Sequence, residues 1–250
     1  MKSVNSDIAY EFIRKRILNG TFPPGYPLMT QDLSADIGVS RTPIRDGLRQ
    51  LENDGLVVIR TRMGASVKAM DAKEYREMCG LRLALETYAA GLAAEKRNVE
   101  ELHEMEDALE AMRRLTETSA QSEDEGEELI KALRREDVRF HVAIISSAQS
   151  DLLKKEVLRL HIINRVVSGL ESAKTAASKT KQENDEHRRQ VQASHEEIYR
   201  QIAKRDSAGA KIAMDNHIRD IIDSVIRAML RAERVSIPRN LTDDELSYMA

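Results

Sequence analysis

From residue 71 onward the chain shows apolar residues at the spacing of an α-helix. Val138 and Ile145 lie seven positions apart, and Ile198 and Ile202 lie four apart. Residues separated in this way share one face of a helix, so the pattern predicts amphipathic helices that pack against one another. The predicted helices cover residues 72–97, 99–118, 126–148, 150–176, 184–205 and 207–233. Two polar segments remain: 119–126 predicts a loop or a frayed helix end, and 173–186 predicts a solvated helix end and connection rather than a binding patch.

The first 70 residues follow a different pattern, in which short apolar segments alternate with proline and glycine. Residues 7–18 have apolar side chains on one side of a helix, and Gly20 ends that helix. Pro23, Pro24 and Pro27 come next, and three prolines within five residues exclude a helix there. The chain is therefore expected to cross over in extended form.

A compact helix-turn-helix pattern follows this crossover. Thr30 predicts the N-cap of a short helix over 31–37, because a threonine hydroxyl can accept a hydrogen bond from the first helical turn. Ser40 likewise predicts the N-cap of a third helix that runs to about Asn53. Two short strands, over 57–60 and 65–68, then surround the segment 61–64 and predict a hairpin, or wing.

These patterns predict a mainly α protein with two domains and a tail. The expected fold is an N-terminal winged helix-turn-helix over residues 1–70, followed by an all-α antiparallel helical bundle over 71–233. The last residues, 234–250, predict a C-terminal tail that is poorly ordered until it docks. A chain of 250 residues is long enough for two such units.

Charge separates the two domains as well. The first 70 residues carry three net positive charges, whereas residues 71–250 carry six net negative charges. A basic excess in the smaller domain suits a polyanionic partner, and the acidic remainder argues against nucleic-acid contact along the whole chain. Cys79 is the only cysteine, so no internal disulfide can form, which fits a reducing compartment. With no signal-peptide pattern and no stretch of about 20 apolar residues, the expected location is the cytoplasm, away from any membrane.

The third helix carries the first candidate site. Arg41, Arg45 and Arg49 recur every four residues and therefore share one face, while Ile44 and Leu48 lie on another. Arginines at the start of a helix can bind guanine edges or phosphates in the major groove of DNA, and Thr42 can add a further contact. Such a face alone is more often a solvated helix surface. The order helix, crossover, short helix, turn, arginine-bearing helix and hairpin favours DNA binding.

The second candidate site lies in the helical domain. Asp137 and His141 are four residues apart and share a helix face, and His195 and His217 lie on two later helices. If the bundle directs these four side chains inward, one oxygen and three nitrogen ligands would suit Zn²⁺, with Ni²⁺ and Mn²⁺ as alternatives. Such a site keeps coordination positions open for a ligand. Any single one of these histidines is more often a packed or surface residue.

Residues 14–67 resemble the GntR family, above all through the segment Val39-Ser40-Arg41-Thr42-Pro43-Ile44-Arg45. The resemblance implies a winged helix-turn-helix whose wing tip, at Gly64, enters the minor groove. It implies DNA contacts from Arg41, Thr42, Arg45, Arg49 and Gln31. Two positions depart from the family pattern, because Gln31 stands where a charged residue is frequent and Met63 replaces a polar or basic residue.

Residues 71–230 resemble the FadR C-terminal (FCD) domain, through the segments around His141, His195 and His217. This resemblance implies that Asp137 and the three histidines bind a divalent metal. It also implies that Arg82 holds the carboxylate of an effector, although Arg82 could instead pair with Glu86 at i+4. Three weaker effector-binding candidates lie on the helix that is expected to pass over the effector pocket. They are His161, Asn164 and Arg165. The remaining histidines, His103 and His187, are expected at the surface.

Together the two resemblances imply a homodimeric regulator that reads an inverted-repeat operator in double-stranded DNA and is expected to act as a repressor. A small organic-acid effector bound at the metal would change its operator affinity. A second hypothesis makes the metal itself the signal. A third makes the helical domain a metal-dependent enzyme, but no general base accompanies the four proposed ligands, and Glu100 to His103 supplies only one of the two Glu-x-x-His motifs that a di-iron bundle needs.

Overall fold

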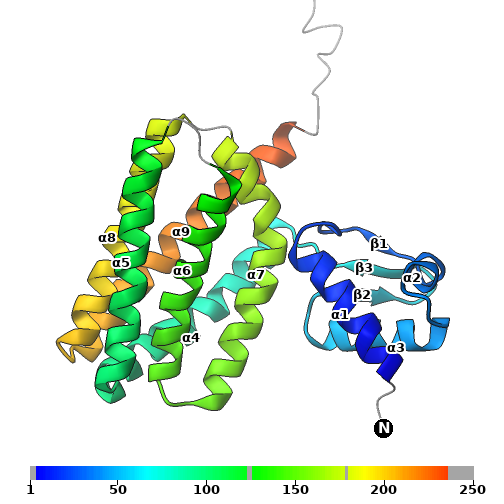
Figure 1. Ribbon diagram of the computed structural model, residues 1–250, viewed down its shortest axis with the longest axis horizontal. Coiled ribbons are helices and arrows are strands. Elements are labelled where there is room, and N and C mark those ends of the chain that lie inside the picture. Colours follow the sequence, from blue (N-terminus) through cyan, green and yellow to red (C-terminus); the bar gives the residue numbers. More distant parts are fainter. Residues whose placement is uncertain (1–3, 123–125, 178–179, 236–250) are drawn as a thin grey trace, which may run out of the picture.

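The computed structural model describes residues 4–122, 126–177 and 180–235. Within them a small winged-helix head lies beside a bundle of long helices (Figure 1). The predicted fold class is confirmed: the molecule is mainly α, with a winged helix-turn-helix before an all-helical part. Residues 236–250 of the predicted tail lie outside the described residues.

The head contains three helices and a three-stranded antiparallel sheet of strand order β1-β3-β2. Its elements are α1 (Val4–Leu18), β1 (Pro27–Leu28), α2 (Thr30–Ile37), α3 (Arg41–Asn53), β2 (Val57–Arg60) and β3 (Gly64–Val67). Strand β1 was absent from the prediction. It forms because the extended crossover lays Pro27 beside Ser66 and Leu28 beside Ala65, and an edge strand tolerates proline. The N-cap of α2 is Met29, so the prediction of Thr30 was one residue late.

The bundle consists, over the described residues, of six helices. They are α4 (Ala72–Lys96), α5 (Val99–Gln121), α6 (Glu127–Ser147), α7 (Asp151–Ala177), α8 (Lys181–Ala203) and α9 (Ser207–Val235). All six were predicted, with ends that differ by up to three residues. Helices α5, α7 and α8 extend into the two polar segments, in agreement with the helix ends that were among the interpretations of those segments. Charged residues on an exposed helical face are compatible with helix, so polarity alone does not fix the residue at which such a helix ends.

Capping boxes set the start of three of these helices. Asp71 accepts a hydrogen bond from the backbone N–H of Glu74 (2.8 Å), and the side chain of Glu74 accepts one from the N–H of Asp71. Asn98 forms the same reciprocal pair with Glu101 at the start of α5. Thr180 begins α8 in the same way. Each cap satisfies N–H groups that have no partner within the helix.

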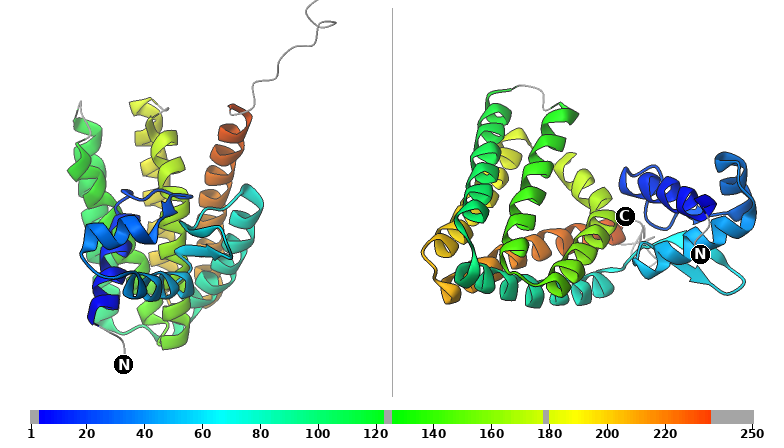
Figure 2. Two further views of the ribbon diagram at one scale, coloured as in Figure 1. Left: turned by 90° about the vertical axis from the view of Figure 1, so that its right-hand side faces the viewer. Right: turned by 60° about the horizontal axis from the view of Figure 1, so that its bottom comes forward.

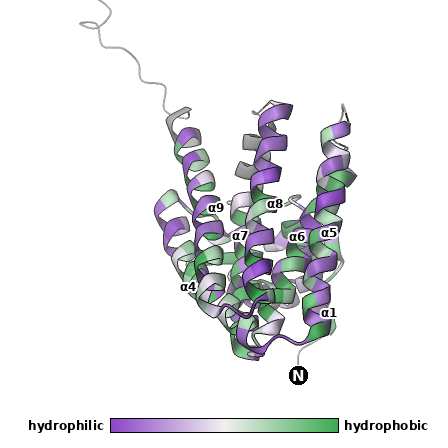
Figure 3. Ribbon diagram, turned by 90° about the vertical axis from the view of Figure 1, so that its left-hand side faces the viewer, coloured by the Kyte–Doolittle hydropathy of each residue, from purple (hydrophilic) through white to green (hydrophobic). Residues whose placement is uncertain are grey.

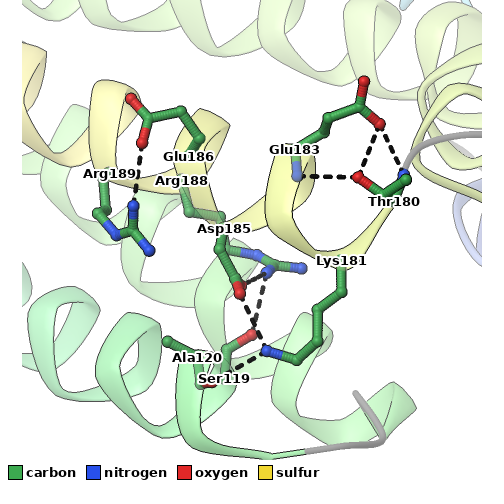
Figure 4. Close-up of polar contacts among 9 residues, drawn as sticks. All are labelled: Ser119, Ala120, Thr180, Lys181, Glu183, Asp185, Glu186, Arg188 and Arg189. Carbon is green, nitrogen blue, oxygen red and sulfur yellow. Dashed lines mark hydrogen bonds and ion pairs between the residues drawn. The ribbon is translucent and has the colours of Figure 1, made fainter.

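Basic side chains join the helix ends across the bundle. Arg97 donates to the carbonyl of Ile202 (3.0 Å), and Arg205 donates to the carbonyl of Glu95 (2.9 Å), so the ends of α4 and α8 cap each other. At the other end of α8, Lys181 donates to the carbonyl of Ala120 and binds Asp185, both at 2.9 Å (Figure 4). These contacts fix α8 against its neighbours at both of its ends.

The head and the bundle share one hydrophobic core. A single cluster of buried residues combines Ile44, Leu48 and Leu51 of α3 with Tyr75 of α4 and Ile163 of α7. Helix α7 lies on the side of the bundle that meets the head (Figures 1 and 2). The long helices carry both hydrophilic and hydrophobic residues along their length (Figure 3). Among the described helices, none combines the length and apolar character needed to cross a membrane.

Candidate metal centre and DNA-reading helix

Three buried histidines from three helices meet inside the bundle. His141 of α6, His195 of α8 and His217 of α9 expose 5%, 0% and 2% of their surface. Their ring centroids lie 5.2 Å (141 to 195), 5.2 Å (141 to 217) and 4.5 Å (195 to 217) apart. One ligand nitrogen from each lies within 4.8 Å of the others. The tertiary fold therefore brings together residues that are separated by up to 76 positions in the chain.

The ring nitrogens of this cluster have the properties of metal ligands. Nδ1 of His141, both ring nitrogens of His195 and Nε2 of His217 are buried and have no hydrogen-bond partner in the described structure. Burial lowers the pKa of His141 and His195 far below the ordinary histidine value, and His217 lowers both further. The pKa of His217 falls to about 4, again mainly through burial. At neutral pH the three rings are therefore uncharged and can donate lone pairs to a cation.

Ser194 determines which nitrogen of His217 is available. Its hydroxyl donates to the carbonyl of Val191 (2.7 Å) and lies 2.8 Å from Nδ1 of His217. A hydroxyl has one proton, so both bonds form when Nδ1–H of His217 donates to the serine oxygen. Nε2, the buried nitrogen without a partner, then carries the lone pair. Sequence reasoning missed this role of Ser194, because only the fold places residue 194 beside residue 217.

Asp137 lies at the edge of the histidine cluster. Its Oδ1 is 3.5 Å from Nε2 of His195, and 45% of its side chain is exposed. Partial loss of solvation by the surrounding protein disfavours the charged carboxylate and raises the pKa of Asp137 to about 6. A cation at the histidines would favour the ionised carboxylate, since an opposite charge lowers a carboxyl pKa.

Arg82 and Glu86 form a buried ion pair close to the histidines. Nε of Arg82 donates to Oε1 of Glu86 at 2.8 Å, and the two side chains are 3% and 1% exposed. Burial by itself would raise the pKa of Glu86, but Arg82 and then His161 outweigh it and hold that pKa below its ordinary range. Arg82 keeps one nitrogen, Nη1, that is buried without a hydrogen-bond partner in the described structure. The pairing with Glu86 that the spacing suggested is present.

The three candidates on α7 have different positions. His161 points at Glu86, with Nε2 3.0 Å from Oε2, and its ring centroid is 5.7 Å from that of His141. Asn164 accepts a hydrogen bond from Tyr75 of α4 (2.8 Å). Arg165 is not at this site: it is exposed and lines a surface groove between α7 and α1, because it follows Asn164 by one residue and so turns to another face of the helix. His103 and His187 are exposed, as expected.

Helix α3 presents its candidates to solvent. Arg41, Thr42, Arg45 and Arg49 are all exposed, while Ile44, Gly47, Leu48 and Leu51 are buried on the other side. Gln31 of α2 accepts a hydrogen bond from Nη2 of Arg41 at 3.3 Å and so supports that arginine.

The wing ends in exposed residues beside α3. Gly64 adopts a φ of +88°, with open space around its Cα, and Arg62 adopts +67°, a value that residues other than glycine rarely show. Met63 exposes 76% of its surface. Glu52 of α3 accepts a hydrogen bond from the backbone N–H of Ile59, which joins the hairpin to that helix.

Comparison with protein families agrees with this geometry. Residues 5–67 match the model described as bacterial regulatory proteins, gntR family, and residues 77–220 match the model of the FCD domain. The chain belongs to the GntR family of regulators with an FCD domain. It is accordingly a transcriptional regulator and not an enzyme, and its GntR winged helix implies DNA binding.

Curated relatives are of the same kind. The chain is 34% identical over 145 residues to the uncharacterized regulator YdhC of Bacillus subtilis, an alignment that covers 58% of this chain and 61% of YdhC. It is 29% identical over 235 residues to the regulator LutR of Bacillus subtilis, covering 83% of this chain and 94% of LutR. The transcriptional repressor RspR of Escherichia coli is 25% identical over 225 residues, or 89% of each chain.

Solved structures share the fold. Escherichia coli McbR/YncC superposes with a TM-score of 0.67 at 17% identity, over 90% of this chain and 98% of that one. A putative GntR regulator from Rhodococcus superposes with a TM-score of 0.65 at 20% identity, over 90% and 99%. At these identities the likeness concerns the arrangement of helices and strands only.

Proposed function

We propose that this regulator is a repressor of the FadR-type subgroup whose affinity for its operator is set by a small carboxylate bound at a metal in the helical domain. The observation that supports this proposal is the group of buried polar atoms without partners: ring nitrogens of His141, His195 and His217, and Nη1 of Arg82. Buried polar groups cost free energy unless they are paired, so their convergence indicates that a ligand pairs them. Such a regulator would work in the cytoplasm, where its DNA is.

The metal would be held by the three histidines with Asp137 as the fourth ligand. The donor set of three imidazoles and a carboxylate suits Zn²⁺ first, with Ni²⁺ and Mn²⁺ as alternatives. When bound, the cation would supply open coordination positions for ligand oxygens. Ser194, by accepting a hydrogen bond from Nδ1–H of His217, would keep Nε2 unprotonated and available to the metal. Hydrogen bonds to the nitrogen that does not bind the metal commonly orient histidine ligands in this way.

The effector would contact both Arg82 and the bound metal. Nη1 of Arg82 is the free donor, and Glu86 holds the guanidinium in place through Nε. His161 lies across Glu86 and is 23% exposed, so it can contact an incoming molecule. Because Glu86 already neutralises Arg82, a carboxylate effector would depend on the metal for most of its charge pairing.

The DNA-reading surface would comprise Arg41, Thr42, Arg45 and Arg49 on α3, with Gln31 supporting Arg41 and Gly64 at the wing tip. All of these residues are exposed on the head.

A homodimer would place two such heads on an inverted repeat, with half-sites about one helical turn apart. The outer face of α4 supports a dimer, because Leu81 and Tyr88 lie seven positions apart and expose 58% and 54% of their surface.

Metal sensing is the second candidate function. The three buried histidines and Asp137 come from one chain, so the site needs neither a partner chain nor an effector to bind a cation. If the metal is the signal, chelation alone abolishes or induces operator binding and organic acids have no effect. If the effector is the signal, organic acids change operator affinity only in the metal-loaded protein.

The decisive experiment combines metal analysis with DNA binding. Protein purified without chelators is expected to contain about one metal ion per chain, measured by mass spectrometry, and His195→Ala is expected to lower metal affinity at least about a hundredfold. His103→Ala, an exposed histidine on α5, is the matched control and should keep the metal. A duplex selected from a random library by the wild-type protein then serves for titration with carboxylic acids. Equal metal content in His195→Ala and wild type would contradict the proposed site.

A further inference from the structure

Helix α7 separates the candidate metal centre from the DNA-reading head and contacts both. On one side His161 lies 3.0 Å from Glu86, and Asn164 accepts a hydrogen bond from Tyr75. On the other side Ile163 joins the buried cluster that contains the core of the head. Successive residues of a helix are about 100° apart, so Ile163 points away from His161 by about 160°. One turn of α7 therefore touches both sites.

The contact of Ile163 with the head falls at the end of the DNA-reading helix. A Cβ built on Gly55 would lie 2.7 Å from Cδ1 of Ile163, closer than real Cβ contacts. Gly55 directly follows the C-cap of α3, and its φ of +80° is a conformation that suits glycine. A larger residue at this position would therefore require the side chain of Ile163, α7 or the end of α3 to shift.

Gly55 moves together with α3 because hydrogen bonds hold it there. Its N–H donates to the carbonyl of Glu52, and the N–H of Leu56 donates to that of Leu51, both at 2.9 Å. Tyr10 of α1 donates to Asp54, the C-cap residue, at 2.8 Å. A shift of Ile163 would therefore displace the end of α3 as a unit, since close-packed interiors transmit displacement.

We infer that the contact between Ile163 and Gly55 couples the metal centre to the DNA-reading helix. Glu86 is the first link, because it contacts His161 and lies 4.0 Å from Nδ1 of His141. Occupation of the histidine cluster would move Glu86 and His161, α7 would follow, and Ile163 would press on Gly55. This inference rests on the proposed metal binding and concerns the effect of the bound metal by itself, before any carboxylate effector binds. Ile163 would act as a positioning residue that contacts neither the metal nor DNA.

The test uses Zn²⁺ alone as the probe and the duplex selected by the wild-type protein. In the wild type, Zn²⁺ is expected to change operator affinity at least about fivefold, a usual size for coupling between sites. Ile163→Val removes only Cδ1, the atom nearest Gly55. In this variant the ratio of operator affinities with and without Zn²⁺ should be close to one, while Zn²⁺ affinity stays within about twofold of the wild type. Ile202→Val is the matched control: it is equally conservative, fully buried, and lies in a cluster that contains no residue of the head.

Hydrogen exchange supplies a readout that needs no DNA. Zn²⁺ should change the exchange rates of the amides of Gly55 and Leu56 in the wild type and in Ile202→Val, and leave them unchanged in Ile163→Val. If Zn²⁺ changed the operator affinity of Ile163→Val as much as that of the wild type, the proposed coupling would be overturned. Zn²⁺ binding without any effect on the wild type would overturn the coupling and leave the metal site intact, whereas failure to bind Zn²⁺ would overturn both.

Discussion

The two functional regions of this regulator are built in opposite ways. In the head the candidate DNA contacts are exposed, and the three arginines among them come from one helix, α3, and follow its period. In the bundle the candidate metal ligands come from three helices, and all three histidines are buried. An exposed site costs little to keep in the absence of its ligand, whereas a buried polar site is unfavourable until a ligand pairs it. The same kinds of substitution should therefore have different consequences in the two regions.

The largest expected effect concerns the buried ion pair. Glu86→Ala leaves Arg82 buried and without its partner, which should lower the free energy of unfolding by about 3–5 kcal/mol in urea titrations. The matched control is Glu77→Ala on the same helix, because Glu77 also pairs at i,i+4, with Lys73, but that pair is exposed. Its expected effect is below about 1 kcal/mol. Equal effects would remove the contrast between buried and exposed charges.

Acid should weaken the metal-free protein through the histidines. The folded pKa of His217, about 4, lies below the value of about 6.5 for an unfolded histidine, so the unfolded state binds more protons in this range. Its contribution of about 3 kcal/mol is complete above pH 6.5 and is lost as the pH falls toward 4. Urea titrations in a chelator from pH 7 to 4 measure this. His217→Asn should flatten the slope, and the exposed control His103→Asn should not.

Substitution in the exposed region should separate DNA binding from metal binding. Arg45→Ala removes one donor from α3 and is expected to weaken DNA binding by about 1–3 kcal/mol while metal content and stability stay the same. The control is Arg189→Ala, an exposed arginine of α8 that lies outside the head. Fluorescence anisotropy with the selected duplex gives the affinities. An unchanged affinity of Arg45→Ala would exclude Arg45 from the interface.

The smallest expected effect concerns the contact between the head and the bundle at Gly55 and Ile163. Gly38→Ala and Gly55→Ala both place alanine at a positive φ, which costs about 1 kcal/mol. Gly38 has open space around it, whereas Gly55 faces Ile163, so Gly55→Ala should lower the free energy of unfolding by about 1 kcal/mol more. Ile163→Val added to Gly55→Ala should recover part of that difference. Equal free energies of unfolding for the two glycine variants would mean that Ile163 and Gly55 can move apart at little cost.

Most of the architecture could be read from the chain because it follows from local rules. Helical periodicity located all six bundle helices, and the prolines and glycines located the crossover and the wing. The errors concern strand β1, which exists only through its pairing with β3, and the residues at which helices end in polar segments. Arg165 was predicted at the effector site because it lies on the helix expected to pass over the pocket, yet it turns away from Asn164 by about 100° and is exposed.

The sequence by itself determined the order of elements, the arginine face of α3 and the likeness to GntR and FCD domains, since each depends on residues that are close together in the chain. Only the tertiary structure decided that His141, His195 and His217 meet, that Ser194 holds His217, that Glu86 lies between Arg82 and His161, and that Ile163 touches Gly55. These contacts join residues far apart in sequence, and they exist because packing the apolar faces of the helices brings their few buried polar side chains together.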